Sequence, residues 1–440
     1  ADPPMRPLAL SEHRVIRLVV LCALYVAQGV PFGFLTVTLA AAMAANGAET
    51  EAIASVFALG TIPWAFKWVW GPFVDRFGNS RWGRRRPWIL VAQAGMIGTL
   101  VAMAMMPDPV ADLQTLGTLV VLHNIFNSLQ DVCVDAMAID LLPPEDRGKA
   151  SGLMYGAKYG GTAIGGGGLS ILAGLGGMPI AYVGMIAVIG GIALLPLLTI
   201  EKPGDLLFPW SKPSEPPVAP TADHEAAAEL EARPRSTIAL LKDLGGAFTV
   251  PAAIVTAVVA LLATAASGLL SPIATNLFVA DLGWSQEEYG AATGGAAVFA
   301  GLAGAVLGGF LADLVGPRRI FATCSLILAA LFAVFGLGDV FWENRTLVWT
   351  YLIFESALAG CLNAAFFAIC FGVCRPSIAA TQFTAYMALM NLGVSGVYML
   401  SGPLEDRYGV QGTYLIGAAM QFSVVLLVPF TLVLRRKTAI

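Results

Sequence analysis

Residues 71–86, with the sequence GPFVDRFGNSRWGRRR, decide the architecture of this chain because they return in altered form as residues 309–319, GFLADLVGPRR. In both copies an apolar run ends in Gly-x-x-x-Asp, and a glycine and a pair of arginines follow. A further glycine precedes each copy at nearly the same interval, Gly29 before the first and Gly268 before the second. Matching landmarks at matching intervals predict two homologous halves.

The composition indicates a membrane protein. The 440 residues are 57% apolar and only 12% charged, with a mean hydropathy of +0.75, whereas a soluble domain carries about 25% charged residues. At about 20 residues per transmembrane helix, the chain has room for a dozen spans. A transmembrane β-barrel would need alternating strands of about ten residues, which are absent from the sequence. The net charge of −4 gives no reason to expect nucleic acid as a partner.

Apolar runs bounded by charge, proline or glycine predict an all-α membrane protein with twelve transmembrane helices in two pseudo-symmetric six-helix halves. The first six helices are expected near residues 15–45, 51–75, 87–106, 115–142, 147–174 and 179–200. The second six are expected near residues 247–280, 286–314, 318–338, 346–374, 377–404 and 412–434. The predicted halves are therefore residues 1–200 and 247–440. The proline-rich residues 201–246 are predicted to be a cytoplasmic linker.

The basic residues predict the orientation. Most of the 25 Lys and Arg residues fall in the termini, in the linker and in the loops on the same side of the membrane. The opposite loops hold only Arg345 and Arg407, and Lys67 and Lys158 lie within predicted spans. Because cytoplasmic loops carry the excess of Lys and Arg, both termini and the linker are expected in the cytoplasm.

The repeated Gly-x-x-x-Asp pattern with its arginines resembles the loop signature of the major facilitator superfamily. The resemblance implies a secondary transporter in which two six-helix halves rock around a central site, with ion pairs that close the cytoplasmic side. The alternative is that the arginines only set the orientation of the chain in the membrane. The second copy of the motif, at the equivalent place in the other half, favours a role in the gate. The residues assigned to this cytoplasmic gate are Gly71, Asp75, Arg76, Arg84, Arg85, Arg86, Asp313, Arg318 and Arg319.

Other segments are similar to the peptide, acetyl-CoA and drug transporter branch of that superfamily, namely residues 25–31, 66–76, 83–88, 130–135 and 381–393. This branch includes AmpG-type muropeptide permeases, acetyl-CoA transporters and siderophore importers. The resemblance implies a symporter of the bacterial inner membrane that imports a muropeptide-like sugar-peptide together with protons. An acyl-CoA or a siderophore is the alternative cargo. Two deep cations, Lys67 and Lys158, are few for the phosphates of an acyl-CoA, which disfavours that option.

Ionisable groups inside the membrane cost about 2.5 to 3.5 kcal/mol each on the insertion scale, so they are functional candidates. Five are expected at depth: Asp131, Asp135, Lys158, Glu355 and Lys67. The two aspartates share one helical face with several polar residues. Counted along their helices, Lys158 matches Asp131 in depth and Lys67 matches Asp135, so both pairs are feasible.

This set contains three carboxylates but only two ammonium groups. One carboxylate therefore has no cationic partner and is able to carry a proton. We therefore expect proton coupling through Asp131 or Glu355, with Lys158 as a switchable partner or as a ligand for an anionic group of the substrate. The alternative is a static ion-pair network that holds the second, fourth and fifth helices together. Gly152, Gly156 and Gly160 are expected to pack closely against a neighbouring helix.

Polar residues elsewhere in the predicted spans are candidates for substrate binding. Each of them could instead form a hydrogen bond between helices. The candidates are Tyr25, Gln28, Asn127, Gln130, Tyr155, Tyr159, Asn276, Asn363 and Asn391.

No motif for other chemistry is present in the sequence. The six cysteines lie in apolar runs without a C-x-x-C pair, and only His123 of the three histidines falls in a span, so neither a metal site nor a cofactor is expected. No phosphate-binding loop of the Gly-x-x-x-x-Gly-Lys type occurs, which excludes an ATP-driven pump for this chain. An enzyme and a membrane sensor are the disfavoured alternatives. The expected partners are a small-molecule substrate, protons and the lipid bilayer, and the chain is expected to be a monomer.

Overall fold

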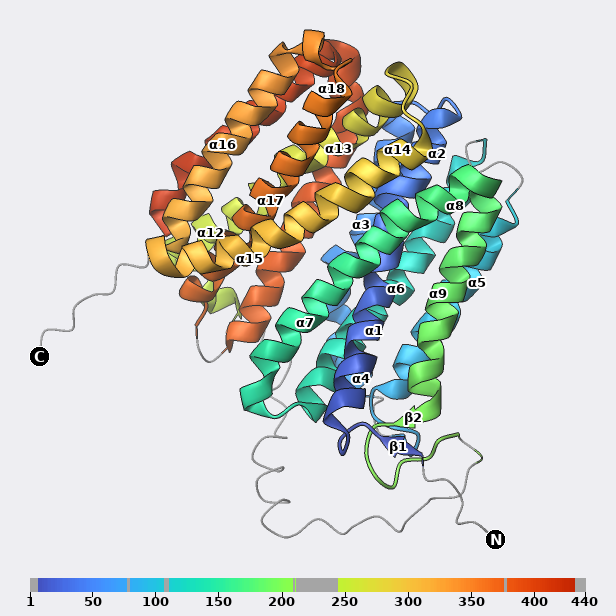
Figure 1. Cartoon of the computed structure of the whole chain (residues 1–440). Helices are drawn as coiled ribbons and strands as arrows, with labels where there is room; N and C mark the ends of the chain where they lie inside the picture. The colour runs from blue at the N-terminus through green and yellow to red at the C-terminus, as the bar shows by residue number, and fades with distance from the viewer. Residues whose placement is uncertain are drawn as a thin grey trace, which may run out of the picture.

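The computed structural model describes residues 7–76, 80–106, 111–208, 210, 244–375 and 378–431, without the side chains of 144, 145, 147, 148, 379 and 380. Figure 1 shows two helical bundles side by side, an N-terminal one in blue to green and a C-terminal one in yellow to red. Most of the predicted linker, from residue 211 to residue 243, and the end of the chain from residue 432 lie outside the described residues.

The N-terminal half contains six helical spans, three of which are interrupted. Span 1 is α1 (Arg14–Gly33), η1 (Phe34–Leu39) and α2 (Ala40–Ala45). Span 2 is α3 (Thr50–Ala65), η2 (Lys67–Val69) and α4 (Trp70–Arg76), and spans 3 and 4 are α5 (Arg86–Ala104) and α6 (Leu113–Leu141). Span 5 is α7 (Pro144–Ala163), η3 (Ile164–Gly168) and α8 (Leu169–Gly176), and span 6 is α9 (Met178–Leu198). Two short strands, β1 (Leu8–Ala9) and β2 (Thr199–Ile200), pair in parallel at one end.

The C-terminal half repeats this arrangement. Span 7 is α12 (Pro251–Leu262), α13 (Ala265–Asn276) and η4 (Leu277–Asp281), and span 8 is α14 (Gln286–Tyr289), η5 (Gly290–Ala296) and α15 (Ala297–Val315). Span 9 is α16 (Pro317–Leu337), followed by η6 (Asp339–Phe341), and span 10 is α17 (Arg345–Val373). The long α18 (Ala379–Leu427), continued by η8 (Val428–Thr431), contains spans 11 and 12. Gly409, with φ of 68° and ψ of 176°, breaks α18 into these two helices.

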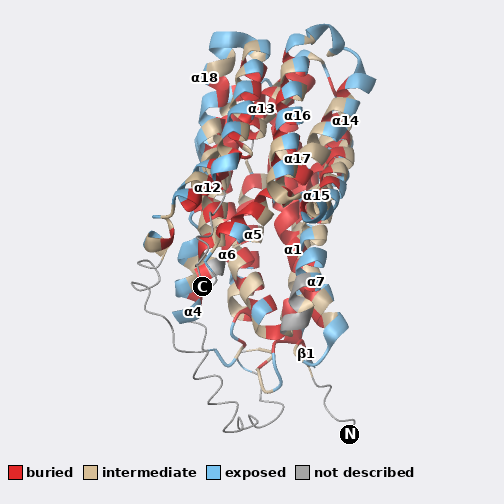
Figure 2. Cartoon of the chain, turned by 90° about the vertical axis from the view of Figure 1, so that its left-hand side faces the viewer, coloured by how far each residue is buried: buried red, intermediate tan, exposed pale blue. Residues whose placement is uncertain are grey.

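Twelve spans were predicted, and the described residues account for all of them. Nine helical stretches are long and apolar enough to cross a membrane, and the last of these runs through Gly409 and so holds two spans. The remaining two spans are α6 and α7 to α8. Both contain several polar and charged residues, which is why hydropathy alone does not find them. Buried residues concentrate inside each half (Figure 2). The all-α fold of two six-helix halves is therefore confirmed.

Spans 1 and 5 pack through glycines. A Cβ on Gly29 would lie 2.1 Å from the carbonyl oxygen of Lys158, and a Cβ on Gly161 would lie 2.3 Å from that of Val26. Small residues four positions apart allow such close backbone contact in a membrane. The predicted close packing of Gly152, Gly156 and Gly160 is wrong, because a Cβ on any of them would meet nothing within 4 Å. The glycine that packs, Gly161, is one position further along the helix than Gly160.

The two halves contact each other through backbone at a crossing of η3 and η5. A Cβ on Gly294 would lie 2.3 Å from the carbonyl carbon of Gly166. Both segments are π-helical, and such wide turns disturb the regular hydrogen-bond ladder. Two hydroxyls from neighbouring elements donate to carbonyls of η3. The Thr38 hydroxyl of η1 donates to the Gly165 carbonyl at 2.7 Å, and the Ser170 hydroxyl of α8 donates to the Gly166 carbonyl at 2.5 Å. These hydroxyls stabilise the irregular turn where the halves meet.

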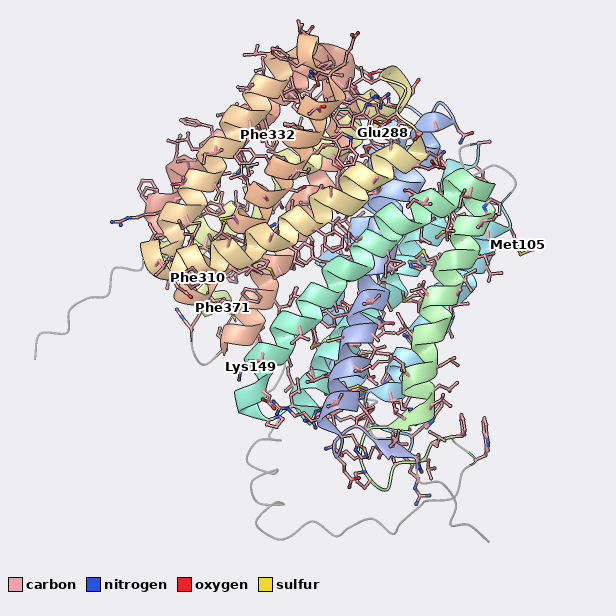
Figure 3. All side chains as sticks on the ribbon, viewed as in Figure 1. Met105, Lys149, Glu288, Phe310, Phe332 and Phe371 are labelled. Carbon is pink, nitrogen blue, oxygen red and sulfur yellow. The ribbon has the colours of Figure 1, made fainter. Side chains whose placement is uncertain are left out.

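The halves converge at one end and diverge at the other. At the converging end, Asn276 Nδ2 donates to Thr50 Oγ1 at 3.1 Å across the two halves, and α7 and α15 approach each other towards α8 and α14 (Figure 1). Their opposite ends, near Lys149 and Phe310, lie apart (Figure 3). The diverging end is the one that the basic residues predict to face the cytoplasm.

Candidate functional site

One face of α6 carries the polar side chains of Asn124, Asn127, Ser128, Asp131 and Asp135, called the polar stripe. Part of this stripe lies against the second span. Three of its side chains, Asn124, Ser128 and Asp131, accept hydrogen bonds or an ion pair from residues of α3, η2 and α4. The three contacts are Trp64 Nε1 to Asn124 Oδ1 at 3.0 Å, Trp70 Nε1 to Ser128 Oγ at 3.0 Å and Lys67 Nζ to Asp131 Oδ2 at 2.7 Å.

A break in the second span positions the lysine of this ion pair. The helix α3 ends at Ala65, Phe66 has φ of −105° and ψ of 6°, and the 3-10 turn η2 begins at Lys67. Pro63 lies inside the last turn of α3, where it has no N–H to donate to the carbonyl four residues earlier. The break also leaves the Trp64 carbonyl oxygen 3.5 Å from Asn391 Nδ2 of α18. Interrupted helices in transporters often place such groups at the binding site.

The second carboxylate of the stripe has a neutral partner. Asp135 accepts a hydrogen bond from the Tyr25 hydroxyl of α1. The ring of Tyr25 meets that of Tyr155 edge to face, with centroids 5.7 Å apart. Tyr155 is 48% exposed although it lies beside the Asp135 carboxylate. Among the described residues, no ion pair joins Asp135 to a cation.

The position of Lys158 differs from the predicted one. Depth along the helices suggested a pair with Asp131, but Lys67 occupies that carboxylate instead. The Lys158 ammonium lies over the ring of Trp64, 5.1 Å from its centroid, and the Lys67 ammonium lies 5.8 Å from the same ring. Within the described part of the chain, the Lys158 ammonium makes no hydrogen bond or ion pair. The glycine packing of span 5 on span 1 sets the rotation of α7, and depth counting cannot supply that rotation.

The remaining deep carboxylate, Glu355, belongs to the C-terminal half. It lies on α17 and accepts a hydrogen bond from the Ser267 hydroxyl of α13 at 3.0 Å. No cation pairs with it among the residues that the structure describes. Glu355 is therefore separated from the Lys67–Asp131 pair by its position in the other half.

Several predicted substrate-binding residues are enclosed within a half. Gln28, Asn127 and Gln130 are 0% exposed, and both amide atoms of Gln28 and of Asn127 are buried without a hydrogen-bond partner. Gln130 Nε2 donates to the Leu24 carbonyl at 3.0 Å. By contrast, Tyr155 is exposed and Tyr159 is half-buried.

Two predicted amides of the C-terminal half differ in their surroundings. Asn276 donates to Thr50 at the converging end and so joins the two halves there. The Oδ1 atom of Asn363 is buried without a partner in the described structure.

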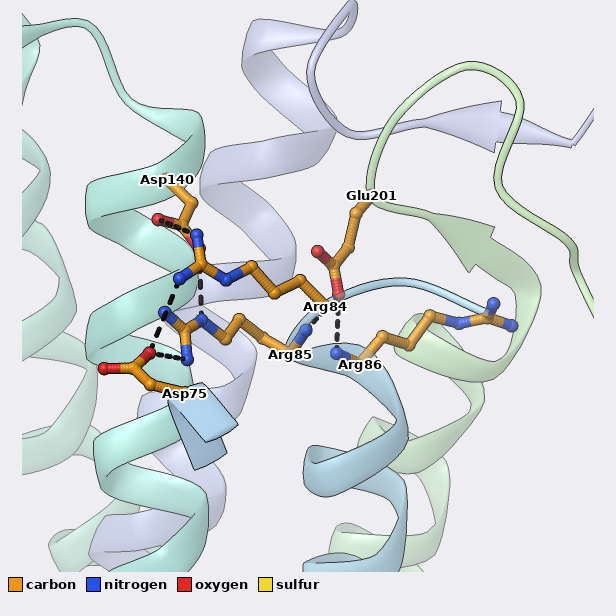
Figure 4. A network of polar contacts seen from close by, with 6 residues as sticks. All are labelled: Asp75, Arg84, Arg85, Arg86, Asp140 and Glu201. Carbon is orange, nitrogen blue, oxygen red and sulfur yellow. Dashed lines mark hydrogen bonds and ion pairs between the residues drawn. The ribbon is translucent and has the colours of Figure 1, made fainter. Parts of the chain in front are cut away.

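The five charged gate residues predicted in the first copy lie at the end of the N-terminal half that points away from the converging side. The Asp75 carboxylate is 2.7 Å from Arg85 Nη1 and 3.5 Å from Arg84 Nη2. Asp140 of α6 bridges the same two arginines, at 3.1 Å from Arg85 Nε and 3.8 Å from Arg84 Nη1 (Figure 4). Asp140 was not among the predicted residues, although its place at the end of the polar helix beside this loop was a usable signal.

Arg86 does not join this ion-pair network, contrary to its predicted place in the gate. Its side chain points away from Asp75 (Figure 4) and donates to the carbonyls of Pro196, Leu197, Leu206 and Leu207. The Glu201 carboxylate accepts from the backbone N–H groups of Arg85 and Arg86, each at 2.6 Å. Arg86 and Glu201 therefore attach the first residues of the linker to the start of α5.

Gly71 and Arg76 complete the first copy of the motif. A Cβ on Gly71 would meet nothing within 4 Å, so no described segment packs closely against this glycine in this conformation. Arg76 is exposed at the end of α4.

The second copy of the motif is arranged differently from the first. Arg318 Nε donates to the Thr431 hydroxyl at 3.0 Å, and its Nη2 atom donates to the Thr431 carbonyl at 3.0 Å. No ion pair joins Asp313 to Arg318 or Arg319 among the described residues. The second motif thus ties α16 to the end of span 12, and the predicted ion pairs are confined to the first copy.

Two six-helix halves, a buried polar cluster at the middle of the spans and an opening on one side define a secondary transporter that works between two sides of a membrane. The family model of the Major Facilitator Superfamily matches residues 18–259 and 256–439. The chain therefore belongs to the Major Facilitator Superfamily. It is a multi-pass membrane protein of a family of permeases, and not an enzyme.

Among known proteins, the chain is similar to the anhydromuropeptide permease of Escherichia coli (strain K12), with 26% identity over 414 residues, 92% of this chain and 77% of the relative. Among solved structures, the nucleoside transporter NupG matches with a TM-score of 0.70 and 14% identity, over 94% of this chain and 98% of that one. A D-xylose-proton symporter matches with a TM-score of 0.68 and 15% identity, over 94% and 97%. At 14% and 15% identity, these two structures show the fold of this chain and not its substrate.

Proposed function

We propose that this chain imports a muropeptide-like sugar-peptide into the cytoplasm, together with protons, by alternating access. The observation that carries the cargo is the 26% identity, over 92% of the chain, to a relative named as an anhydromuropeptide permease. A site that combines carboxylates, ammonium groups, tyrosines and amides suits an amphiphilic solute with many hydrogen-bonding groups.

The proposed proton carrier is Asp135. Asp131 is already neutralised by Lys67 at 2.7 Å, whereas Asp135 is bonded to the neutral hydroxyl of Tyr25. A buried carboxylate without a cationic partner is costly, and a proton removes that cost. Asp135 also lies beside the half-exposed Tyr155, on the side where the halves diverge, so a proton can leave in this conformation.

The conformation is consistent with the proposed direction. The halves diverge at the end that carries Lys149 (Figure 3), and the basic residues predict that this end faces the cytoplasm. An importer releases its solute from such a conformation. Contacts at the other end, such as Asn276 to Thr50, must open when the solute enters.

The test is uptake of labelled anhydromuropeptide into proteoliposomes with an imposed pH gradient, acidic outside. We expect concentrative uptake that collapses when a protonophore is added. Asp135→Asn should abolish the response to the gradient while it still exchanges labelled solute for unlabelled solute. Asp131→Asn serves as the comparison and should keep the response.

Three outcomes would contradict parts of this proposal. Equal uptake with and without the gradient would overturn proton coupling. A gradient response that survives in Asp135→Asn would overturn the carrier. Competition by an acyl-CoA or a ferric siderophore, with none by unlabelled muropeptide, would overturn the cargo.

A further inference from the structure

Lys158 lies within the fifth span, and its ammonium makes no ion pair or hydrogen bond with the described residues. Its ammonium lies 5.1 Å from the centroid of the Trp64 ring, an interaction worth about 2 kcal/mol when desolvated. That gain is smaller than the about 2.5 to 3.5 kcal/mol that a deep charge costs on the insertion scale. The Trp64 ring is held in place by its Nε1 hydrogen bond to Asn124 at 3.0 Å. The site therefore presents a positioned cation that an anion would complete.

The charge balance of the N-terminal half limits what that anion can be. Lys67 and Lys158 balance Asp131 and Asp135 when both carboxylates are ionised. A proton on Asp135 leaves one net positive charge, and the Lys67–Asp131 pair at 2.7 Å keeps that charge on Lys158. One net charge matches a monoanion. A dianionic phosphate would bring excess negative charge beside Asp131.

We propose that Lys158, positioned by Trp64, is the subsite for a monoanionic carboxylate of the transported solute, and that its occupancy is coupled to the proton on Asp135. This inference rests on the proposed function, and it names the chemical group of the solute that the protein recognises. Trp64 acts as a positioning residue, because its ring lies beside the Lys158 ammonium and is itself held by Asn124.

The coupling is electrostatic and reciprocal. The groups around Asp135 are Asp131 on the same helix, Tyr25 of α1, Lys67 of η2, and Tyr155 and Lys158 of α7. Of the charged groups in this set, only the Lys158 side chain lacks an ion-pair or hydrogen-bond partner within the described residues. A carboxylate bound to Lys158 adds a negative charge near Asp135 and so favours its protonation. By linkage, the proton raises the affinity for the carboxylate by the same factor.

The experiment uses N-acetylmuramic acid and its carboxyl methyl ester, which share the ring and the side arm and differ in charge. Binding to the purified full chain in nanodiscs is measured by calorimetry between pH 6 and pH 8, where the free carboxyl stays ionised. Wild type should prefer the acid by about tenfold at pH 6, which corresponds to about 1.4 kcal/mol. This preference should shrink towards pH 8. Asp135→Asn should keep the full preference at both pH values.

Variants locate the effect. Lys158→Gln should bind acid and ester equally, and Trp64→Leu should reduce the preference without reversing it. Lys149→Gln, which removes an exposed lysine at the start of the same helix, should behave as wild type. Equal binding of acid and ester by wild type would overturn the proposal. This comparison uses the wild-type protein alone, so it does not depend on the folding of any variant. A preference that survives in Lys158→Gln would also overturn it.

The failure of this inference can be told from the failure of the proposed cargo. If anhydromuropeptide is not taken up, but the acid is preferred through Lys158, the cargo is wrong and the carboxylate subsite stands. If anhydromuropeptide is taken up and Lys158→Gln keeps the preference, the cargo stands and the subsite is wrong.

Discussion

Lys67 Nζ lies 2.7 Å from Asp131 Oδ2, and this ion pair joins the interrupted second span to the polar face of the fourth. Asp131 is 4% exposed, so the pair is largely shielded from water. The pair fixes which of the two lysines is neutralised. Lys158 is thereby left for another role, and Asp135 is left with a hydroxyl partner.

Breaking this pair from one side should destabilise the protein. Lys67→Met leaves Asp131 buried without a cation, and removal of one partner of a buried pair costs about 3 to 5 kcal/mol. The double variant Lys67→Met/Asp131→Leu should recover most of that loss, since no unpaired charge remains. Thermal unfolding in nanodiscs measures both, with Lys149→Met as an exposed control. A single variant as stable as wild type would show that the pair is not buried in the membrane.

The crossing of η3 and η5 predicts a sharp difference between two adjacent glycines. Gly294→Ala would place a Cβ 2.3 Å from the Gly166 carbonyl carbon, whereas the nearest atom to a Cβ on Gly295 is 3.8 Å away. Gly294→Ala should therefore force the halves apart at this crossing and lower the rate of solute uptake by about tenfold or more, equivalent to about 1.4 kcal/mol. Gly295→Ala should transport as wild type does. Equal rates for the two variants would contradict this contact.

The two arginines of the first gate motif should differ in importance. Arg85 bridges Asp75 and Asp140 and its side chain is 6% exposed, whereas the Arg84 side chain is 52% exposed. Exposed ion pairs contribute about 0 to 1 kcal/mol, so Arg84→Gln should change thermal stability little. Arg85→Gln should lower it clearly, and Asp140→Asn should have a smaller effect of the same sign. If Arg84→Gln proved the more damaging, the arrangement in Figure 4 would not describe the dominant state.

Glu201 should give the stability a pH dependence. Burial raises the pKa of this carboxyl above its ordinary value of 4.5, and the backbone N–H donors of Arg84, Arg85 and Arg86 offset only part of that effect. The native state therefore binds the proton more readily than the unfolded state does. The contribution of Glu201 to stability is largest below pH 4.5 and is lost as the pH rises through the folded pKa.

The measurement compares the unfolding temperatures of wild type and Glu201→Gln from pH 4 to pH 7.5. The stability of wild type relative to the variant should fall as the pH rises. Glu12→Gln, at an exposed glutamate near β1, is the matched control and should track wild type. A relative stability that rises with pH would mean that the N–H donors outweigh burial at Glu201.

The sequence by itself determined the number of spans, the two-half repeat and the polar face of α6. These follow from hydropathy, from the 3.6-residue period and from repeated landmarks, all of which are local properties of the chain. The predicted boundaries of α5 and α16 accordingly agree with the structure within two residues. Asp131, Asp135 and Lys67 were found because charge is scarce within the spans.

Only the tertiary structure decided which partners these residues have. The helical period gives the face and the depth of Lys158, but the rotation of α7 depends on which glycines contact the first span, and Gly160 and Gly161 fit the same spacing pattern. For the same reason, sequence alone did not separate Arg86 from Arg85, although one lies against the linker and the other against Asp75. Neighbours along the chain share a motif, but packing between distant segments determines the atoms that each side chain meets.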